Sequence, residues 1–262
     1  MPIVFSAIVP HPPILIPTIG KENINQLKAT SGSYLKLEHA LYASQAETII
    51  LISPHGNSQE KAFTINLSHE FNGDFEEFGD LATKFNLDGD IALAHKIKEK
   101  SETEIPMQFI SQENLDHGSA IPLYLLTRHL PKIKIIPIYY SGLDLGAHYN
   151  FGRIIKNKLL NSNTRVAIIA SGDLSHKLSK NAPAGYSPKG EKFDKKLIDC
   201  VLKKRTEEII KFKPELIAEA GECGLKSIVI LLGILDGMKY NPRLLSYESP
   251  FGVGYLTMNF EL

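Results

Sequence analysis

The chain has 262 residues, of which 43% are hydrophobic and 22% are charged, and this composition predicts a globular protein with a sizeable buried core. Lysine plus arginine equals aspartate plus glutamate at 29 each, and no basic cluster stands out along the sequence, so we expect no nucleic-acid partner and no membrane partner. Two cysteines are too few for a disulfide scaffold, the first residues lack the basic segment of a signal peptide, and the longest apolar run, 228–235, is too short to span a bilayer. We therefore expect a cytoplasmic protein.

The first two predicted strands each end in a proline followed by a histidine. Residues 3–9 form an apolar, strand-like run that leads into Pro10 and His11, and residues 49–52 form a β-branched run that leads into Pro54 and His55. In open α/β sheets, ligands bind at the carboxyl edge of the strands, and imidazole is a ligand for zinc, iron, copper and nickel. The pairing predicts a metal shared by the two histidines; the alternative is two ordinary loop histidines bonded to the backbone.

Strand and helix patterns alternate along the rest of the chain. Segments with strand character are 3–9, 49–52, 62–67, 107–110, 133–140, 164–170 and 247–260. Segments with helix character are 22–27, 34–43, 91–100, 119–129, 145–160, 191–203, 214–221 and 222–235. The Gly-, Asp- and Phe-rich segment 72–90 is interpreted as an irregular excursion, because its periodicity is weak. The alternation predicts one α/β domain over residues 1–262, with a mostly parallel or mixed central sheet flanked by helices on both faces.

Two further histidines follow predicted turns at the same edge of the sheet. His176 comes shortly after the strand at 164–170, with Asp173 and Ser175 before it, and a histidine near an acid can serve as a general acid and base. The alternative is a capping turn built by Asp173 and Ser175. His117 follows Asp116 before a helix; it either lies at the metal site or belongs to an ordinary helix-entry turn.

Glu222 and Cys223 open the last long predicted helix and compete as a third metal ligand. Two histidines and one carboxylate suit non-haem Fe(II), whereas two histidines and a thiolate favour zinc or copper. A glutamate at a helix start is also favoured by the helix dipole alone. We take Glu222 as the third ligand, and we expect only one of the two side chains to face the metal, because neighbours in a helix lie about 100° apart.

The ordered set of these segments resembles the catalytic subunit of class III extradiol ring-cleavage dioxygenases, the LigB-like superfamily, near its Memo-related branch. The resemblance covers nearly the whole chain. The segments that carry it are Val9-Pro-His11-Pro-Pro13, Ser53-Pro-His55-Gly56, Asp116-His117-Gly118 with Pro122-Leu123, Ser171-Gly-Asp-Leu-Ser-His176, Gly185-Tyr186 with Phe193-Asp194, Glu222-Cys-Gly224, and Ser249-Pro-Phe-Gly-Val-Gly-Tyr255.

The resemblance implies a non-haem Fe(II) centre, although zinc or another divalent metal fits the same ligands. His11 and His55 match the two histidine ligands, and Glu222 is the match chosen for the carboxylate, whereas the Memo-like branch has a cysteine at the position of Cys223. The implied substrates are a small aromatic molecule of catechol type and O2. A homo-oligomer is compatible with the sequence.

The resemblance also implies roles for the remaining site residues. His176 matches the family's catalytic acid and base, His117 matches the histidine that lines the substrate and oxygen site, and Asp173 is expected to orient His176. Two rival functions use the same ligands: a Memo-like metal-binding regulatory protein without dioxygenase turnover, and a zinc-dependent hydrolase that activates water.

Overall fold

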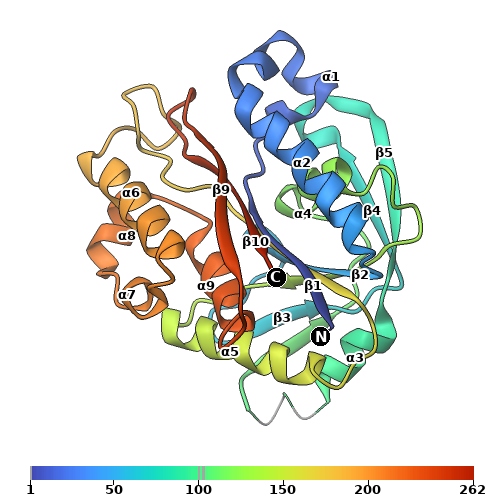
Figure 1. The fold of residues 1–262 in the computed structure, drawn as a ribbon. Helices are drawn as coiled ribbons and strands as arrows, with labels where there is room; N and C mark the ends of the chain where they lie inside the picture. The colour runs from blue at the N-terminus through green and yellow to red at the C-terminus, as the bar shows by residue number, and fades with distance from the viewer. Residues whose placement is uncertain (1, 100, 102–103) are drawn as a thin grey trace.

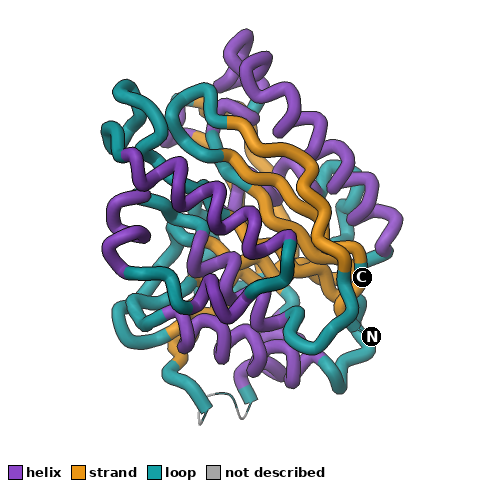
Figure 2. Tube along the Cα trace, turned by 60° about the vertical axis from the view of Figure 1, so that its left-hand side comes forward, coloured by secondary structure: helices purple, strands orange, loops and turns teal. Residues whose placement is uncertain are grey.

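A ten-stranded mixed sheet runs through the middle of the part of the chain that the structure describes (Figure 1). The structure is a computed structural model that describes residues 2–99, 101 and 104–262. The strands follow one another in the order β4 (Glu70–Phe75), β5 (Asp80–Gly89), β7 (Lys134–Tyr139), β2 (Thr48–Ser53), β8 (Val166–Ser171), β1 (Ile3–Val9), β10 (Tyr255–Glu261) and β9 (Asn241–Glu248), with β3 (Phe63–Asn66) paired to β7 and β6 (Met107–Ile110) paired to β3. Helices lie on both sides of these strands, which are orange in Figure 2.

The four central strands β7, β2, β8 and β1 run parallel to one another. Their residues are mostly apolar and buried, as expected of parallel strands that are covered on both faces. Successive side chains point to opposite faces, so Ile50 and Ile52 pack into one core whereas Ile49 and Leu51 pack into the other. Because the strands are parallel, their carboxyl ends lie at the same edge of the sheet.

Helices cover each face of this sheet. The first layer packs on the core that contains Ile50, and it consists of α3 (Ile91–Lys98), α5 (Leu145–Leu159), α6 (Pro188–Leu202), α7 (Thr206–Ile210), α8 (Pro214–Ala220) and α9 (Leu225–Ile234). The second layer packs on the core that contains Leu51, and it consists of the 3-10 helix η2 (Lys21–Leu27), α2 (Lys28–Ser44) and α4 (His117–Leu126). Among the described residues, no helix is long and apolar enough to cross a bilayer.

The predicted fold class is confirmed: the sheet is mixed and mostly parallel, with helices on both faces. The excursion predicted at 72–90 is wrong, because β4 and β5 pair there as an antiparallel hairpin. Its apolar residues Phe71, Phe75 and Leu87 are buried, but polar residues and Gly73 between them weaken the period-2 pattern. Gly73 is required here, because an added Cβ would lie 2.1 Å from the Phe85 ring.

Several predicted helix boundaries need correction. The gap between the predicted helices 22–27 and 34–43 does not exist, since α2 is continuous from Lys28, while residues 21–27 form a 3-10 helix. α4 begins at His117 rather than at Ser119, because Asp116 is the cap and accepts a hydrogen bond from Ser119 N at 3.1 Å. α7 lacked a sequence signal, and α3 ends at Lys98, so that residue 100 of its predicted range lies outside the described residues.

The last long helix also starts later than predicted. α9 begins at Leu225, and Gly224 is its cap, so Glu222 and Cys223 lie in the turn before the helix. The expectation that these two side chains are separated by the rotation of a regular helix is therefore wrong. Their directions are set by the contacts of this turn.

Two glycines let α5 and α9 pack closely beneath the sheet. A Cβ at Gly152 would lie 2.2 Å from Ile230 O, and a Cβ at Gly233 would lie 2.2 Å from Tyr149 O. The backbones of the two helices are therefore in direct contact, which holds α9, and with it the turn that carries Cys223, against the sheet.

Gly233→Ala is expected to destabilise the protein, because the added methyl collides with backbone, and overpacking of this kind costs about 1–3 kcal/mol. Gly32→Ala is the matched control: Gly32 is exposed in α2 with nothing within 4 Å of an added methyl, and losing such a glycine stabilises a helix by about 0.5–1 kcal/mol. Urea unfolding measures both effects. An unchanged free energy of unfolding for Gly233→Ala would contradict the close helix contact.

Candidate metal centre

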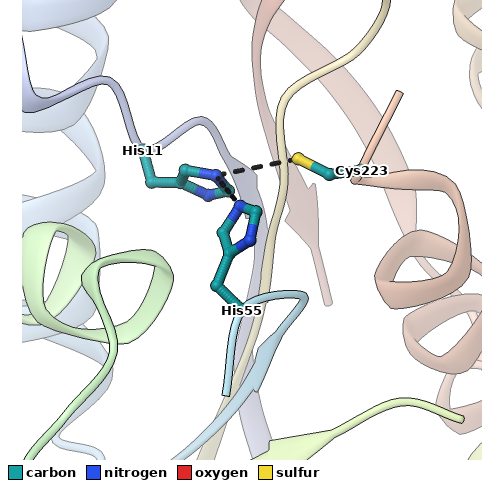
Figure 3. Close-up of side chains that lie close together, drawn as sticks. All are labelled: His11, His55 and Cys223. Atoms are coloured by element: carbon teal, nitrogen blue, oxygen red, sulfur yellow. Dashed lines mark hydrogen bonds between the residues drawn. The ribbon is translucent and has the colours of Figure 1, made fainter. Parts of the chain in front are cut away.

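Three side chains that are far apart in the sequence converge at the carboxyl edge of the sheet (Figure 3). His11 follows β1 and His55 follows β2, and these strands lie on either side of β8. Cys223 reaches the same point from the turn before α9. His11 and Cys223 are buried, whereas His55 lies at the solvent-exposed rim. The site is therefore closed on the side of the sheet and open on the side of His55.

The donor atoms of the three side chains face one another. His11 Nε2 lies 3.0 Å from His55 Nε2 and 3.7 Å from Cys223 Sγ. All three atoms lie within 4.8 Å of one another, and they are the group of ligating side chains that can hold a metal ion among the described residues. The structure thus brings together the two predicted histidine ligands and the cysteine that competes for the third position.

The tautomer of His11 follows from its neighbour Ser171, the last residue of β8. The Ser171 hydroxyl donates its hydrogen to the carbonyl oxygen of Gly118 at 2.6 Å, so it can only accept from His11 Nδ1, which lies 2.9 Å away. Nδ1 of His11 therefore carries the ring hydrogen, and Nε2 presents its lone pair to the centre of the site. A bond from the second ring nitrogen to a fixed acceptor is the usual way in which proteins orient metal-binding histidines.

Both imidazoles stay neutral at ordinary pH. Desolvation lowers the pKa of His11 to about 3, and the neighbouring His117 and His176 lower it further in the same direction. Desolvation, followed by His11, lowers the pKa of His55 to about 3 as well. A metal ion therefore has no bound proton to displace from either ring, which favours binding.

A close backbone contact places Cys223. An added Cβ at Gly172, just after β8, would lie 2.1 Å from Gly224 Cα, so only glycine allows the two segments to approach this closely. The carbonyl oxygen of Asp173 then accepts hydrogen bonds from Cys223 N at 3.2 Å and Gly224 N at 2.9 Å. Asp173 N in turn donates to Cys223 Sγ at 3.3 Å, which points the sulfur at the two histidines.

The side chain of Asp173 contacts His11 with both of its carboxylate oxygens. One carboxylate oxygen accepts a hydrogen bond from the backbone N of His11 at 2.9 Å, and the other lies 3.9 Å from His11 Nε2. Burial raises the pKa of the carboxyl to about 6. Among the described residues, no hydrogen bond joins Asp173 to His176, so the proposed orienting role of Asp173 stays a prediction.

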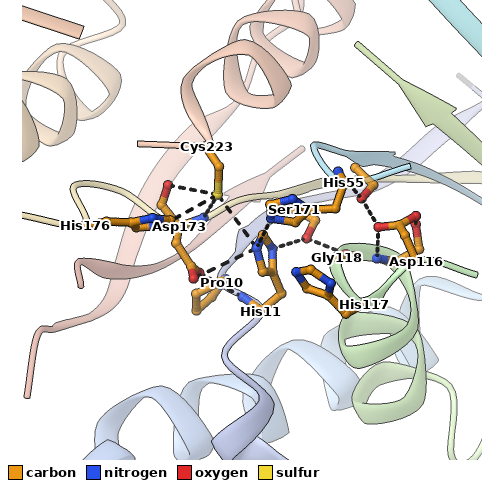
Figure 4. A network of polar contacts seen from close by, with 12 residues as sticks. Pro10, His11, His55, Asp116, His117, Gly118, Ser171, Asp173, His176 and Cys223 are labelled. Carbon is orange, nitrogen blue, oxygen red and sulfur yellow. Dashed lines mark hydrogen bonds and ion pairs between the residues drawn. The ribbon is translucent and has the colours of Figure 1, made fainter. Parts of the chain in front are cut away.

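His117 and His176 lie on two sides of the donor group, as Figure 4 shows. The His117 ring stacks on His55 with centroids 4.3 Å apart, and its Nδ1 lies 3.4 Å from an oxygen of Glu77. Nε2 of the half-buried His176 lies 3.9 Å from Cys223 Sγ. Both predicted histidines are therefore at the site, and their catalytic roles stay predictions.

Glu222 points its carboxylate at the start of α9. One oxygen accepts a hydrogen bond from Leu225 N at 2.5 Å, as a helix cap does. Desolvation raises the pKa of this carboxyl to about 7, while the backbone N–H of Leu225 and the Lys226 cation lower it. The assignment of Glu222 as the third ligand stays a prediction, to be tested against Cys223.

Sequence reasoning did not single out the supporting residues Ser53 and Ser171. The hydroxyl of Ser53 donates to Asp116 at 2.5 Å and accepts from His55 N at 3.3 Å, so it links the cap of α4 to the His55 turn. Both serines end central strands, β2 and β8. A hydroxyl at the carboxyl end of an otherwise apolar strand was the signal available in the sequence.

The chemistry of the donor set suits zinc or another metal that binds nitrogen and sulfur ligands. Zinc binds imidazole nitrogen at about 2.0–2.1 Å and thiolate at about 2.3 Å, which requires nitrogens about 3.3 Å apart and nitrogen and sulfur about 3.6 Å apart. From His11 Nε2 the distances here are 3.0 Å to His55 Nε2 and 3.7 Å to Cys223 Sγ, and the three donor atoms all lie within 4.8 Å of one another. Burial raises the pKa of the Cys223 thiol, so its thiolate depends on a positive charge such as a metal ion.

Gly172→Ala is expected to weaken metal binding by about 10–100-fold, the range typical of changes in groups that hold the ligands, because the methyl pushes Gly224 and Cys223 away. Titration with Co(II) measures affinity, and its thiolate absorption band reports on the sulfur directly. Gly32→Ala serves as the control that leaves the site alone. Wild-type Co(II) affinity with an unchanged band in Gly172→Ala would contradict this account of how Cys223 is placed.

Comparisons with known proteins show which family this chain is similar to. The family described as the catalytic LigB subunit of aromatic ring-opening dioxygenase matches residues 6–258. Protein CA_C1420 of Clostridium acetobutylicum is 32% identical over 264 residues, which cover 97% of this chain and 56% of that protein. The chain thus spans about half the length of this curated relative.

A solved structure has the same fold at low sequence identity. The crystal structure of the uncharacterized protein JW3007 from Escherichia coli K12 superposes with a TM-score of 0.66 at 14% identity, covering 98% of this chain and 99% of that one. Its likeness extends to the fold alone. The family match over nearly the whole length, together with the 32% identical relative, shows that the chain belongs to the family of the catalytic LigB subunit of aromatic ring-opening dioxygenases.

Proposed function

We propose that this protein is a metal-dependent dioxygenase that opens the ring of a catechol-like aromatic molecule with O2. The observation that carries the proposal is the convergence of His11, His55 and Cys223, with His117 and His176 beside them, at one edge of the sheet. Family membership supports the reaction class. A bound divalent metal would supply Lewis acidity and a common site for the two oxygens of a catechol and for O2.

The chain's own residues prepare this site for a neutral or anionic oxygen ligand. His11 and His55 offer unprotonated nitrogens, since both pKa values lie near 3. The rim on the side of His55 is open to solvent, so substrate enters from there, while β8 and α9 exclude water from behind. The rings of His55 and His117 stack on each other beside the donor group, and an aromatic substrate can pack against this pair.

His176 is the proposed acid and base. Its Nε2 lies 3.9 Å from Cys223 Sγ and thus beside the donor group, where a bound substrate would lie. In the reaction, this nitrogen accepts a proton from a phenolic hydroxyl of the substrate and later returns a proton to an oxygen of the opening ring. Two backbone hydrogen bonds, from His176 N to Ala220 O and from Ala184 N to His176 O, hold the main chain of His176 in place.

A second candidate function is favoured by one specific observation. A buried cysteine sulfur belongs to the donor group, and thiolate ligands favour softer metals than the oxygen-activating combination of two histidines and a carboxylate. This favours a metal-binding or redox regulatory protein without dioxygenase turnover. A zinc-dependent hydrolase uses the same ligands, and oxygen uptake separates it from the first proposal.

Replacing each ligand identifies the third donor. His11→Ala and His55→Ala are expected to lose metal sharply, because each leaves two donors. Cys223→Ser is expected to lose affinity and shift preference from zinc and copper towards harder ions. Glu222→Gln separates the two assignments: it loses metal if Glu222 is the third ligand, and it keeps metal if Cys223 is, because only the hydrogen bond from Leu225 N is then weakened.

These four variants are compared after anaerobic loading with Fe(II) and separately with Zn(II), and metal content is measured by elemental analysis. Circular dichroism controls for folding. If Glu222→Gln loses iron while Cys223→Ser keeps it, the carboxylate is the third ligand and the sulfur is not. Full metal retention in His55→Ala would show that His55 is not a ligand and would contradict the proposed metal site.

His176→Ala is expected to keep the metal and to lower turnover by about 10²–10⁴-fold, as the loss of a general acid and base does. Oxygen consumption is measured over a panel of catechols with the iron-loaded protein. His39→Ala is the matched control, since His39 is exposed on α2 and lies outside the described donor group. Wild-type turnover in His176→Ala would contradict the catalytic role of His176. If the wild-type protein consumes no oxygen with any catechol, the second candidate function is favoured.

A further inference from the structure

A groove lined by lysines lies on α6 and the segment that joins α7 to α8. Its volume is about 370 Å³, and five of its seven lining residues are Lys189, Lys192, Lys196, Lys211 and Lys213. The remaining two are Glu215 and Leu216. Figure 1 shows α6, α7 and α8 together on one flank of the molecule.

The local sequence explains why the lysines gather there. Lys189, Lys192 and Lys196 are spaced by three and four residues along α6, which places them on one face of the helix. Lys211 and Lys213 lie on either side of Phe212, whose ring is buried, and alternation turns both lysines outward. The Lys196 ammonium lies 4.6 Å from the centre of the Phe212 ring, so this contact joins the two rows of lysines.

A sequence without a basic run can therefore still form a basic patch on the surface of the folded protein. The chain as a whole has equal numbers of basic and acidic residues, yet this groove has five lysines against one glutamate. Fourteen residues separate the last lysine of α6 in the groove from the next lysine of the groove, so the cluster is a product of tertiary structure.

The charges of the groove are poorly compensated. Nearby lysines are paired: Lys195 of α6 with Glu191 at 2.5 Å, and Lys203, which follows α6, with Asp199 at 2.7 Å. In the groove, Lys211 reaches Glu207 only at 3.8 Å. Within the described part of the chain, Lys189, Lys192 and Lys213 have no ion pair. Like charges at such spacings cost stability, which favours a role in binding an anion.

The shape and chemistry of the groove select the kind of anion. Lys189 and Lys196 are separated along the helix axis by about 10 Å, a length that fits a chain of several phosphate groups. Lysine is a compact charge that contacts phosphate oxygens without requiring the planar geometry of a carboxylate. The groove is concave and of small-molecule size, and its lining has no aromatic ring on which bases of a nucleic acid would stack.

We propose that this groove binds a ligand that carries a chain of two or more phosphate groups. Inorganic polyphosphate and the phosphate chain of a nucleotide share this chemistry. The groove is separate from the donor group of His11, His55 and Cys223, and the proposal does not depend on the function of that site.

The test uses the full chain and inorganic triphosphate as the probe, with binding measured by isothermal titration calorimetry. Saturable one-to-one binding is expected, and it should weaken between about 50 mM and about 200 mM salt because exposed charges are screened. In the triple variant Lys189→Gln, Lys192→Gln and Lys213→Gln, the dissociation constant should rise roughly tenfold or more, since three charged contacts to phosphate are lost.

A matched triple variant separates the groove from the total charge. Lys28→Gln, Lys36→Gln and Lys96→Gln remove the same charge from exposed positions on α2 and α3, and binding should persist in it. Lys192→Glu alone should weaken binding as well and serves if the triple variant fails to fold. Metal content is measured before and after titration, because triphosphate also binds metals.

Further ligands identify the source of the phosphate chain. Equal binding of triphosphate and ATP, with weak binding of AMP, supports recognition of the phosphate chain alone, whereas tighter binding of ATP supports a nucleotide. Absence of binding, an equal loss in both triple variants, or tighter binding of a poly-glutamate peptide than of triphosphate would each overturn the proposal.

Discussion

The hydroxyl of Ser171 is the interaction on which the candidate metal centre depends. It lies at the end of β8, between the strands that deliver His11 and His55, and it connects the His11 ring to the backbone of α4 through Gly118. A sheet strand, a metal-site histidine and a helix are thereby fixed by one side chain. Because the hydroxyl has a single hydrogen, its bond to Gly118 also decides which nitrogen of His11 is free.

The central sheet was predictable because its signal is local. Runs of β-branched residues at 3–9, 49–52 and 164–170 correspond closely to β1, β2 and β8, since a strand buried on both faces needs apolar residues at every position. The positions of His11 and His55 followed from the strand ends. The hairpin of β4 and β5 was missed, because Gly73 takes one of the three buried positions of β4 and few residues of β5 are buried, so the apolar period is weak in both strands.

The directions of the two candidate third donors were beyond the reach of sequence reasoning. Glu222 and Cys223 are neighbours, and their directions depend on how tightly Gly224 packs on Gly172, which lies far earlier in the chain. No local pattern reports such a contact between two segments. The same limit applies to the lysine groove, whose two rows meet only through the contact of Lys196 with Phe212. Contacts between segments that are far apart in the sequence can be identified only in the folded structure.

The order of the donors along the chain has a consequence for the whole molecule. His55 lies 44 residues from His11, and Cys223 lies 212 residues from it. An ion held by all three would therefore act as a cross-link between the first and last parts of the polypeptide, closing loops that are long in the unfolded chain. Since only the folded chain brings the donors together, each tenfold excess of free metal over its dissociation constant adds about 1.4 kcal/mol to the free energy of unfolding. The concentration of free metal would then determine the stability of the folded chain as well as its activity.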